Sequence, residues 1–158
     1  DRAMRILDLA NRGIKIVVWG NNWGSWIGRH PNLIVKNEHL FKDDYAKAIN
    51  GTKINLCFLR KINRDEVTSR SVEIPACGGF MVAERTKRHL NFFREGKEAV
   101  FFDTNNELYD LIKKYLDDDE GRKKIAEAGR KRCVESGYSN KIQLQKMLSV
   151  VDQIKINQ

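Results

Sequence analysis

The segment from Thr68 to Glu84 carries the side chains whose types and spacing are best suited to chemistry. Thr68, Ser69 and Ser71 are residue types whose side-chain oxygen atoms cap helices, and Arg70 lies among them. A helix that begins here presents free backbone N–H groups beside a positive charge, and this combination suits an anion such as a diphosphate. The same spacing also fits an ordinary helix-to-strand corner that carries an incidental arginine.

Two acidic residues flank this arginine. Asp65 and Glu73 lie eight positions apart, one on either side of Arg70. A carboxylate that accepts hydrogen bonds from two sugar hydroxyls, next to an arginine that neutralises phosphate, would recognise a nucleotide sugar. One hydrogen bond to such a charged group contributes about 1.5–3 kcal/mol. Gly78 and Gly79 complete the candidate substrate-binding set, because they end the helix and turn the chain into the next strand.

Strands and helices alternate along the chain. Short apolar runs predict strands at 14–18, 33–35, 54–59, 80–83 and 99–102, with helical patterns between them. This alternation predicts one α/β domain over residues 1–158, with a Rossmann-like, doubly wound parallel sheet flanked by helices. Two further helices at about 120–155 are expected to close the domain, the second with Leu144, Met147 and Val151 facing inward.

A second candidate segment is the loop Gly20–Gly24, which follows the first predicted strand. In open α/β sheets, ligands bind beyond the carboxyl ends of the strands, so Asn21 and Trp23 are candidate substrate-binding residues. The Trp23 ring either stacks on a base or a sugar or packs under the loop.

The composition excludes several classes of protein. No apolar run approaches the roughly 20 residues of a membrane span. Cys57, Cys77 and Cys133 are an odd number without a C-x-x-C pair, which favours free thiols in a reducing, cytoplasmic compartment. The three histidines lack metal-ligand spacing and are expected on the surface or in loops, so neither a metal nor a cofactor is predicted. Fingerprints for dinucleotides and for a phosphate-binding P-loop are absent as well.

The basic character of the chain admits a different function. The net charge is +8 and the pI is about 9.5, with dense basic groups at 85–88 and 122–132. A basic helix at this position predicts a nucleic-acid-binding module, although the charge is otherwise dispersed and we do not expect nucleic acid as the main ligand.

Several motifs occur together in an order that resembles a known family. They are I-N-L-C-F at 54–58, R-S-V-E-I-P-A-C-G-G-F-M at 70–81, G-K-E-A-V-F-F at 96–102 and G-R-K-K-I-A-E-A-G-R-K-R at 121–132. From about Arg2 to about Tyr138 the chain resembles the group 1 glycosyltransferases and, more narrowly, the branch that contains the CgeB-like spore-maturation proteins. E-I-P-A-C-G-G-F is the most specific part of this resemblance.

The resemblance implies a GT-B enzyme in which two Rossmann-like domains face each other and the C-terminal one holds the donor. This chain resembles that donor-binding half, with an N-terminal acceptor-binding domain of the same protein as its partner. Glu73 would hold the nucleotide ribose, and Asp65 would contact the donor sugar, where the family usually has Glu. Arg70 would bind the diphosphate and stabilise charge on the departing nucleotide without a metal. The backbone at 33–38 would read the base.

Two departures from the family pattern leave other functions open. An acceptor-binding domain is not part of these 158 residues, and the strand that usually precedes the first helix of the domain is not seen in the sequence. Asp in place of Glu at position 65 also fits a non-catalytic interaction module descended from a transferase.

Overall fold

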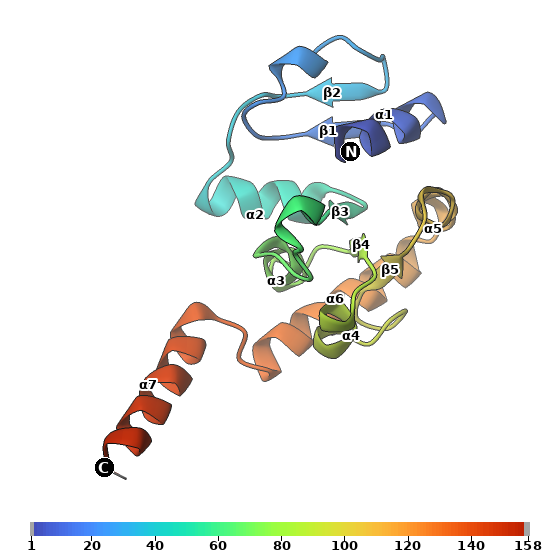
Figure 1. The fold of residues 1–158 in the computed structure, drawn as a ribbon. Coiled ribbons are helices and arrows are strands. Elements are labelled where there is room, and N and C mark those ends of the chain that lie inside the picture. Colours follow the sequence, from blue (N-terminus) through green and yellow to red (C-terminus); the bar gives the residue numbers. More distant parts are fainter. Residues whose placement is uncertain (1, 157–158) are drawn as a thin grey trace.

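Two parallel sheets form the centre of the structure, a computed structural model that describes residues 2–156 (Figure 1). One sheet pairs β1 (Ile16–Val18) with β2 (Leu33–Val35). The other has the order β3-β4-β5, with β3 at Asn55–Cys57, β4 at Met81–Glu84 and β5 at Val100–Phe102. The predicted α/β class with parallel strands flanked by helices is confirmed. The sequence predicted one sheet, whereas β1 and β3 are not hydrogen bonded to each other.

Helices connect and cover these strands. They are α1 (Arg2–Asn11), α2 (Lys42–Gly51), α3 (Arg70–Ala76), α4 (Lys87–Phe92), α5 (Asn105–Asp117), α6 (Asp119–Glu135) and α7 (Asn140–Ile156), with 3-10 turns η1 (Gly24–Trp26) and η2 (Lys61–Asn63). None of the helices described is long and apolar enough to cross a membrane.

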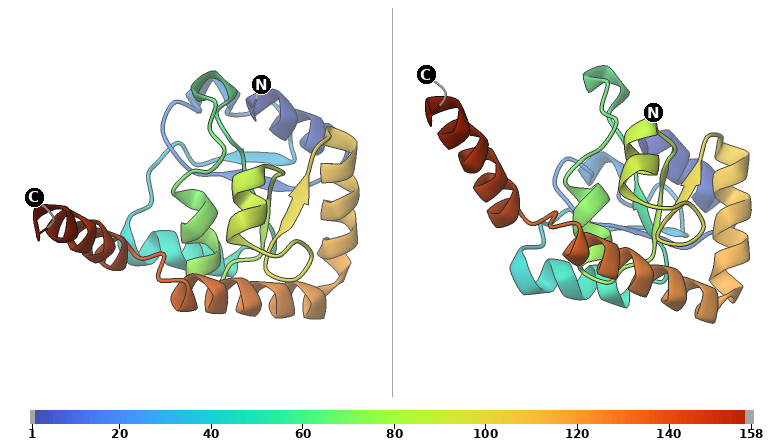
Figure 2. Two further views of the ribbon diagram at one scale, coloured as in Figure 1. Left: turned by 60° about the horizontal axis from the view of Figure 1, so that its bottom comes forward. Right: turned by 90° about the horizontal axis from the view of Figure 1, so that it is seen from below.

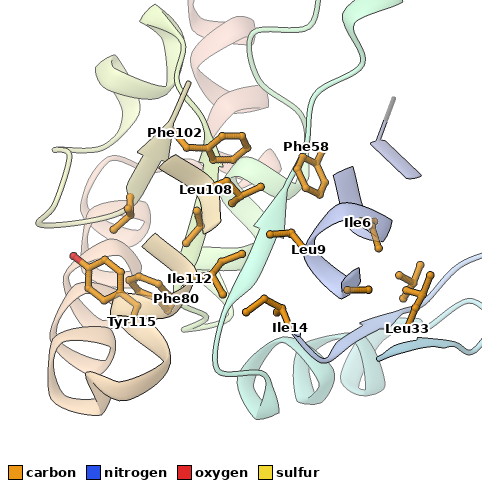
Figure 3. Packing of buried hydrophobic residues seen from close by; sticks show 14 of the residues in the cluster. Ile6, Leu9, Ile14, Leu33, Phe58, Phe80, Phe102, Leu108, Ile112 and Tyr115 are labelled. Atoms are coloured by element: carbon orange, nitrogen blue, oxygen red, sulfur yellow. The ribbon is translucent and has the colours of Figure 1, made fainter. Parts of the chain in front are cut away.

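The three-stranded sheet is buried on both faces. Val82 and Val100 are register partners and belong to one apolar cluster with residues of α1 and α5. Phe102 and Leu108 of this cluster are labelled in Figure 3. Met81 and Phe101 belong to a second cluster, which lies against α3 on the opposite face. This arrangement follows from the alternation of side chains along a strand, because both faces of these strands are apolar.

The two-stranded sheet is covered on one face only. Val18 and Leu33 are buried against α1, whereas the register partners Val17 and Ile34 are 50% and 48% exposed. The sequence predicted burial of this first strand on both faces, and that prediction is wrong for its second face.

Two helix starts differ in how they are capped. The Thr104 hydroxyl accepts a hydrogen bond from the Glu107 N–H at 3.2 Å and caps α5, as the Thr-x-x-Glu spacing in the sequence indicates. Asp43 is a residue type that caps helices, but it lies inside α2, which begins at Lys42, and the preceding Phe41 provides no side-chain cap.

The last helix also differs from the sequence-based expectation. Figures 1 and 2 show α7 extending away from the rest of the molecule. Its apolar stripe is exposed: Leu144 is 57%, Met147 64% and Val151 45% accessible. The predicted inward orientation of these residues is therefore wrong, because periodicity identifies an apolar stripe without identifying what covers it.

The cysteines are free, as the sequence indicated. Cys57 and Cys133 are buried in the second apolar cluster, and Cys77 is half-buried beside it. Burial raises the pKa of the Cys133 thiol to about 11, so this residue behaves as a small apolar side chain rather than as a nucleophile.

Candidate functional site

The candidate site lies at the edge where the carboxyl ends of the parallel strands meet. The loop after β1, the long connection after β3 and the end of β4 all open on this edge. The connection after β3 runs through η2 and leads into the first turn of α3, which carries Arg70 and Glu73. The chain order therefore places most of the predicted residues on one side of the sheets.

Glu73 is exposed in the first turn of α3, and one of its carboxylate oxygens is held by a partner from α2. The Tyr45 hydroxyl donates a hydrogen bond to Glu73 Oε2 at 3.0 Å. Burial, this hydrogen bond and the charge of Glu73 raise the pKa of Tyr45, so the phenol remains a donor at neutral pH. No protein group described here donates to Glu73 Oε1, which is free to accept hydrogen bonds from a ligand.

Arg70 is exposed, and its side chain forms no ion pair or hydrogen bond with another residue of the range 2–156. Its charge and that of Arg60 both act on the Arg2 guanidinium. Burial lowers the pKa of the Arg2 guanidinium, and the charges of Arg70 and Arg60 lower it further. Arg2 comes from the start of α1 and Arg60 from the connection after β3. Three guanidinium groups without carboxylate partners in the described chain create a positive potential that favours a polyanion.

Trp23 is a packing residue in this structure. It is 9% exposed and belongs to the apolar cluster under α1. Its backbone N–H donates to Asn37 Oδ1 at 3.2 Å, its ring lies 5.4 Å from the Arg2 guanidinium, and it contacts Trp26 edge-on. Of the two predicted alternatives, the ring packs under the loop. Asn21 lies in the same loop with its side chain exposed.

Asp65 is half-buried behind η2 and stabilises its own loop. Its Oδ2 accepts a hydrogen bond from the Arg60 N–H at 3.4 Å, and its N–H donates to the Arg60 carbonyl at 3.3 Å. Between them, Arg64 adopts a left-handed backbone conformation with φ of 54°. The second carboxylate oxygen of Asp65 accepts no hydrogen bond from the residues described.

The start of α3 is stabilised in a different way from the predicted capping. Ser69 occupies the capping position without a side-chain hydrogen bond. Instead, Ser71 Oγ accepts a hydrogen bond from the Thr68 N–H at 3.0 Å and lies 2.7 Å from His89 Nε2. Thr68 and Ser69 thus present backbone carbonyls to the first turn, and Ser71 fixes the turn to the core.

His89 is fully buried, which corrects the expectation of a surface or loop position. Its Nδ1 lies 2.6 Å from the Glu84 carbonyl, and a carbonyl only accepts, so Nδ1 carries the proton. Nε2 of the neutral ring is then the acceptor for the Ser71 hydroxyl. Burial lowers the pKa of His89 and favours this neutral form. The pair joins α3 to the carboxyl end of β4.

Gly78 and Gly79 lie at the opposite end of α3, before the amino end of β4. A Cβ atom at Gly79 would lie 2.5 Å from Ile49 Cγ2 and 2.8 Å from Asn55 Nδ2, and Gly78 has a φ of +80°. Both glycines are thus required by close packing and by a left-handed turn. The structure does not bring them together with Arg70 and Glu73.

The family described as glycosyl transferase-like matches residues 2–149. The chain belongs to that family. A comparison with curated proteins finds no significant match. For a glycosyltransferase-like domain, a site at the carboxyl ends of the strands is consistent with the placement of ligands in doubly wound folds.

Four residues of this glycosyltransferase-like domain were not found by sequence reasoning as parts of the site. In the sequence, Tyr45 fits an apolar helical stripe with Ala48 and Ile49, and Arg2 and Arg60 are two of many dispersed basic residues. His89 belongs to no metal-ligand pattern. Tyr45, Arg2 and His89 have their roles through contacts with residues distant in sequence, and Arg60 acts through its charge on Arg2; no local pattern predicts such relationships.

Among residues 2–156, no three His, Cys, Asp or Glu side chains gather in the geometry of a metal site. The basic helix α6 is also less available than its sequence indicates. Arg122 is buried and donates to the Tyr115 and Leu116 carbonyls, and Arg132 donates to the Phe92 carbonyl.

Proposed function

We propose that this glycosyltransferase-like domain binds the nucleotide-diphosphate-sugar donor for a glycosyl transfer that needs no metal. The observation that carries the proposal is the position of Arg70, whose charge acts both on Arg2 and on Tyr45, the tyrosine that orients the Glu73 carboxylate at 3.0 Å. We further propose that the domain is the C-terminal half of a GT-B enzyme of the CgeB-like branch. An N-terminal domain of the same protein would then bind the acceptor.

Glu73 is the proposed ribose ligand. Tyr45 holds Oε2 at 3.0 Å, so Oε1 and the second lone pair of Oε2 accept the two ribose hydroxyls. Because the carboxylate is already oriented before the ligand arrives, binding costs less side-chain entropy. Each hydrogen bond to the charged group contributes about 1.5–3 kcal/mol.

Arg70, Arg2 and Arg60 are the proposed diphosphate ligands. As the bond between the sugar and the diphosphate breaks, negative charge grows on the departing nucleoside diphosphate. Guanidinium groups that are already in place stabilise this charge without reorganisation. The contribution of the α3 terminus is small by comparison, since this helix has only seven residues.

The remaining predicted residues complete the proposed donor site. Asp65 would contact the donor sugar through its free carboxylate oxygen, and Thr68 and Ser69 would border the diphosphate. Asn21 would help to enclose the donor, with Trp23 supporting its loop from below. The backbone after β2, at 36–38, would read the base. A cytoplasmic location is part of this proposal and is supported by the three free thiols.

One observation favours a second candidate function. Asp65 accepts a hydrogen bond from its own loop, and this structural use is compatible with a non-catalytic interaction domain derived from a transferase. Donor binding without transfer in the full-length protein would support that alternative.

A thermal-shift titration tests the proposed function. The chain is titrated with uridine, guanosine, adenosine and thymidine diphosphates and with their sugar conjugates. A ligand at about 100 times its dissociation constant stabilises the folded state by about 2.7 kcal/mol, which gives a rise in Tm of several degrees. We expect one base to be preferred.

Matched variants locate the binding. Glu73→Ala should abolish the shift, whereas Glu127→Ala, which removes an exposed acid on α6, should preserve it. Equal rises in Tm for the two variants would refute the assignment of the site. If none of the ligands raised the Tm of the full-length protein, donor binding itself would be refuted.

A further inference from the structure

We propose that the buried pair Ser71 and His89 sets the position of the segment 66–71, which carries Arg70 into the candidate donor site. His89 is then a positioning residue for the proposed transfer, because it acts through Ser71 and does not touch the ligand. The expected effect on donor affinity rests on the proposed function, whereas the position of the segment can be measured without any ligand.

A chain of hydrogen bonds runs from the end of β4 to the start of α3. His89 Nδ1 donates to the Glu84 carbonyl at 2.6 Å, and Ser71 Oγ donates to His89 Nε2 at 2.7 Å. Ser71 Oγ in turn accepts from the Thr68 N–H at 3.0 Å, and the Ser71 N–H donates to the Thr68 carbonyl at 3.0 Å. Because His89 receives the hydroxyl proton, the lone pairs of Ser71 Oγ are left for Thr68, and two hydrogen bonds close the turn 68–71.

A second contact from α4 holds the same segment. The Thr86 hydroxyl caps α4 by accepting from the His89 N–H at 3.0 Å, and it donates to the Glu66 carbonyl at 2.7 Å. The start of α4, which lies beside α3, therefore contacts the segment at both of its ends, at Glu66 and at Ser71 (Figure 2). Two hydrogen bonds at separate points restrict the segment more than one contact would.

Arg70 depends on this segment for its position. It lies directly before Ser71 in a helix of only seven residues, and Ser69 at the capping position forms no side-chain hydrogen bond. The exposed Arg70 side chain has no partner of its own among residues 2–156, so the backbone of the segment determines where it lies. A ligand that binds Arg70 gains affinity when the segment is already ordered, because less entropy is lost on binding.

The pair is not placed for covalent catalysis. Ser71 and His89 have the spacing of a nucleophile and its general base, but both side chains are fully buried, and no substrate atom can reach Ser71 Oγ. The His89 ring also stacks on Phe101, with 5.5 Å between the ring centroids and an interplanar angle of 8°. A buried polar pair whose hydrogen bonds are all formed makes the elements that it joins more rigid.

Two substitutions of His89 separate its two hydrogen bonds. His89→Gln retains an acceptor near the place of Nε2 for Ser71, whereas His89→Asn retains a donor near the place of Nδ1 for Glu84 and is too short to reach Ser71. Both remove the ring and its stacking on Phe101. Amide hydrogen exchange at Thr68 should be at least about tenfold faster in His89→Asn than in His89→Gln. Equal exchange of the Thr68 amide in the two variants would overturn the proposal.

Thr86 provides a second pair of variants, outside the buried core. Thr86→Val removes the hydroxyl that contacts Glu66, and Thr86→Ser restores it. The Thr68 amide should exchange faster in Thr86→Val and at the rate of the unchanged protein in Thr86→Ser. If Thr86→Val left this rate unchanged, α4 would not hold the segment.

Donor affinity tests the consequence for the site. The Kd of the preferred nucleoside diphosphate should be about 5- to 30-fold higher in His89→Asn than in His89→Gln, which is the cost of ordering about one backbone residue on binding. Thr104→Ala is the control, because it removes the corresponding cap of α5. It should speed exchange of the Glu107 amide and leave the Kd unchanged.

The outcomes distinguish the positioning role from the proposed function. If the unchanged protein binds the nucleoside diphosphate and the two His89 variants bind it equally well, the positioning role is refuted and donor binding stands. If the unchanged protein binds none of the ligands, the proposed function is refuted, and exchange at Thr68 still decides whether His89 holds the segment.

Discussion

The Tyr45 hydroxyl and the Glu73 carboxylate, 28 residues apart, meet at 3.0 Å and join α2 to the first turn of α3. This contact gives the proposed ribose ligand one fixed orientation. Since the pKa of Tyr45 is raised, the phenol keeps its proton and continues to donate throughout the neutral pH range.

Removal of this hydroxyl should weaken nucleotide binding while leaving the fold intact. Tyr45→Phe leaves the Glu73 carboxylate free to change rotamer, and ordering it on binding costs about 0.5–1.5 kcal/mol, so the dissociation constant should rise by about 2- to 10-fold in calorimetric titration. Tyr109→Phe is the control, because the Tyr109 hydroxyl forms no hydrogen bond within the described chain. Identical affinity in the two variants would show that Tyr45 does not orient Glu73 for binding.

The arginine cluster should distinguish a nucleoside diphosphate from its nucleoside. Arg70→Ala should reduce affinity for the diphosphate and leave the weak affinity for the nucleoside unchanged, since only the diphosphate carries charge. The salt dependence of diphosphate binding should fall as well. Arg88→Ala removes an exposed arginine of α4 and serves as the control. A similar loss for both ligands would contradict a role for Arg70 at the diphosphate.

Stability should depend on the protonation of His89. Burial lowers its folded-state pKa below the ordinary value of 6.5, so the unfolded chain binds the extra proton first. The contribution of the neutral ring is complete above pH 6.5 and is lost as the pH falls below that value. Urea unfolding between pH 5 and 8 should show this decline, and His89→Gln should flatten it. An unchanged pH dependence in the variant would exclude His89 as its source.

Close packing at the Gly-Gly turn predicts unequal effects of two alanine substitutions. Gly79→Ala places a Cβ atom 2.5 Å from Ile49 Cγ2, so the free energy of unfolding should fall by about 1–3 kcal/mol. Gly51→Ala meets no atom within 4 Å and should be neutral or slightly stabilising. Chemical denaturation measures both. Equal stability of the two variants would show that the turn can relax around the added methyl group.

Local patterns in the sequence predicted the elements well, because an apolar periodicity or a cap such as Thr104 is a short-range property. They did not predict which strands pair in a sheet. The sequence of Ile16–Val18 does not indicate which strands lie beside it. The same limit explains the error for Leu144, whose stripe is apolar but uncovered. The sequence alone offers the contiguous part of the candidate site, Arg70 and Glu73, which stays a prediction. Tyr45 and Arg2 were missed because only tertiary contacts bring them there.

The exposed stripe of α7 has a thermodynamic consequence. An isolated 17-residue helix is marginal in water, and most helical stability in proteins comes from burial of one face. From Leu144 to Ile154 this helix buries no such face within residues 2–156, so its helix–coil equilibrium is nearly independent of unfolding of the sheets. Its helical content, followed by far-ultraviolet circular dichroism, therefore reports directly on any molecule that covers it.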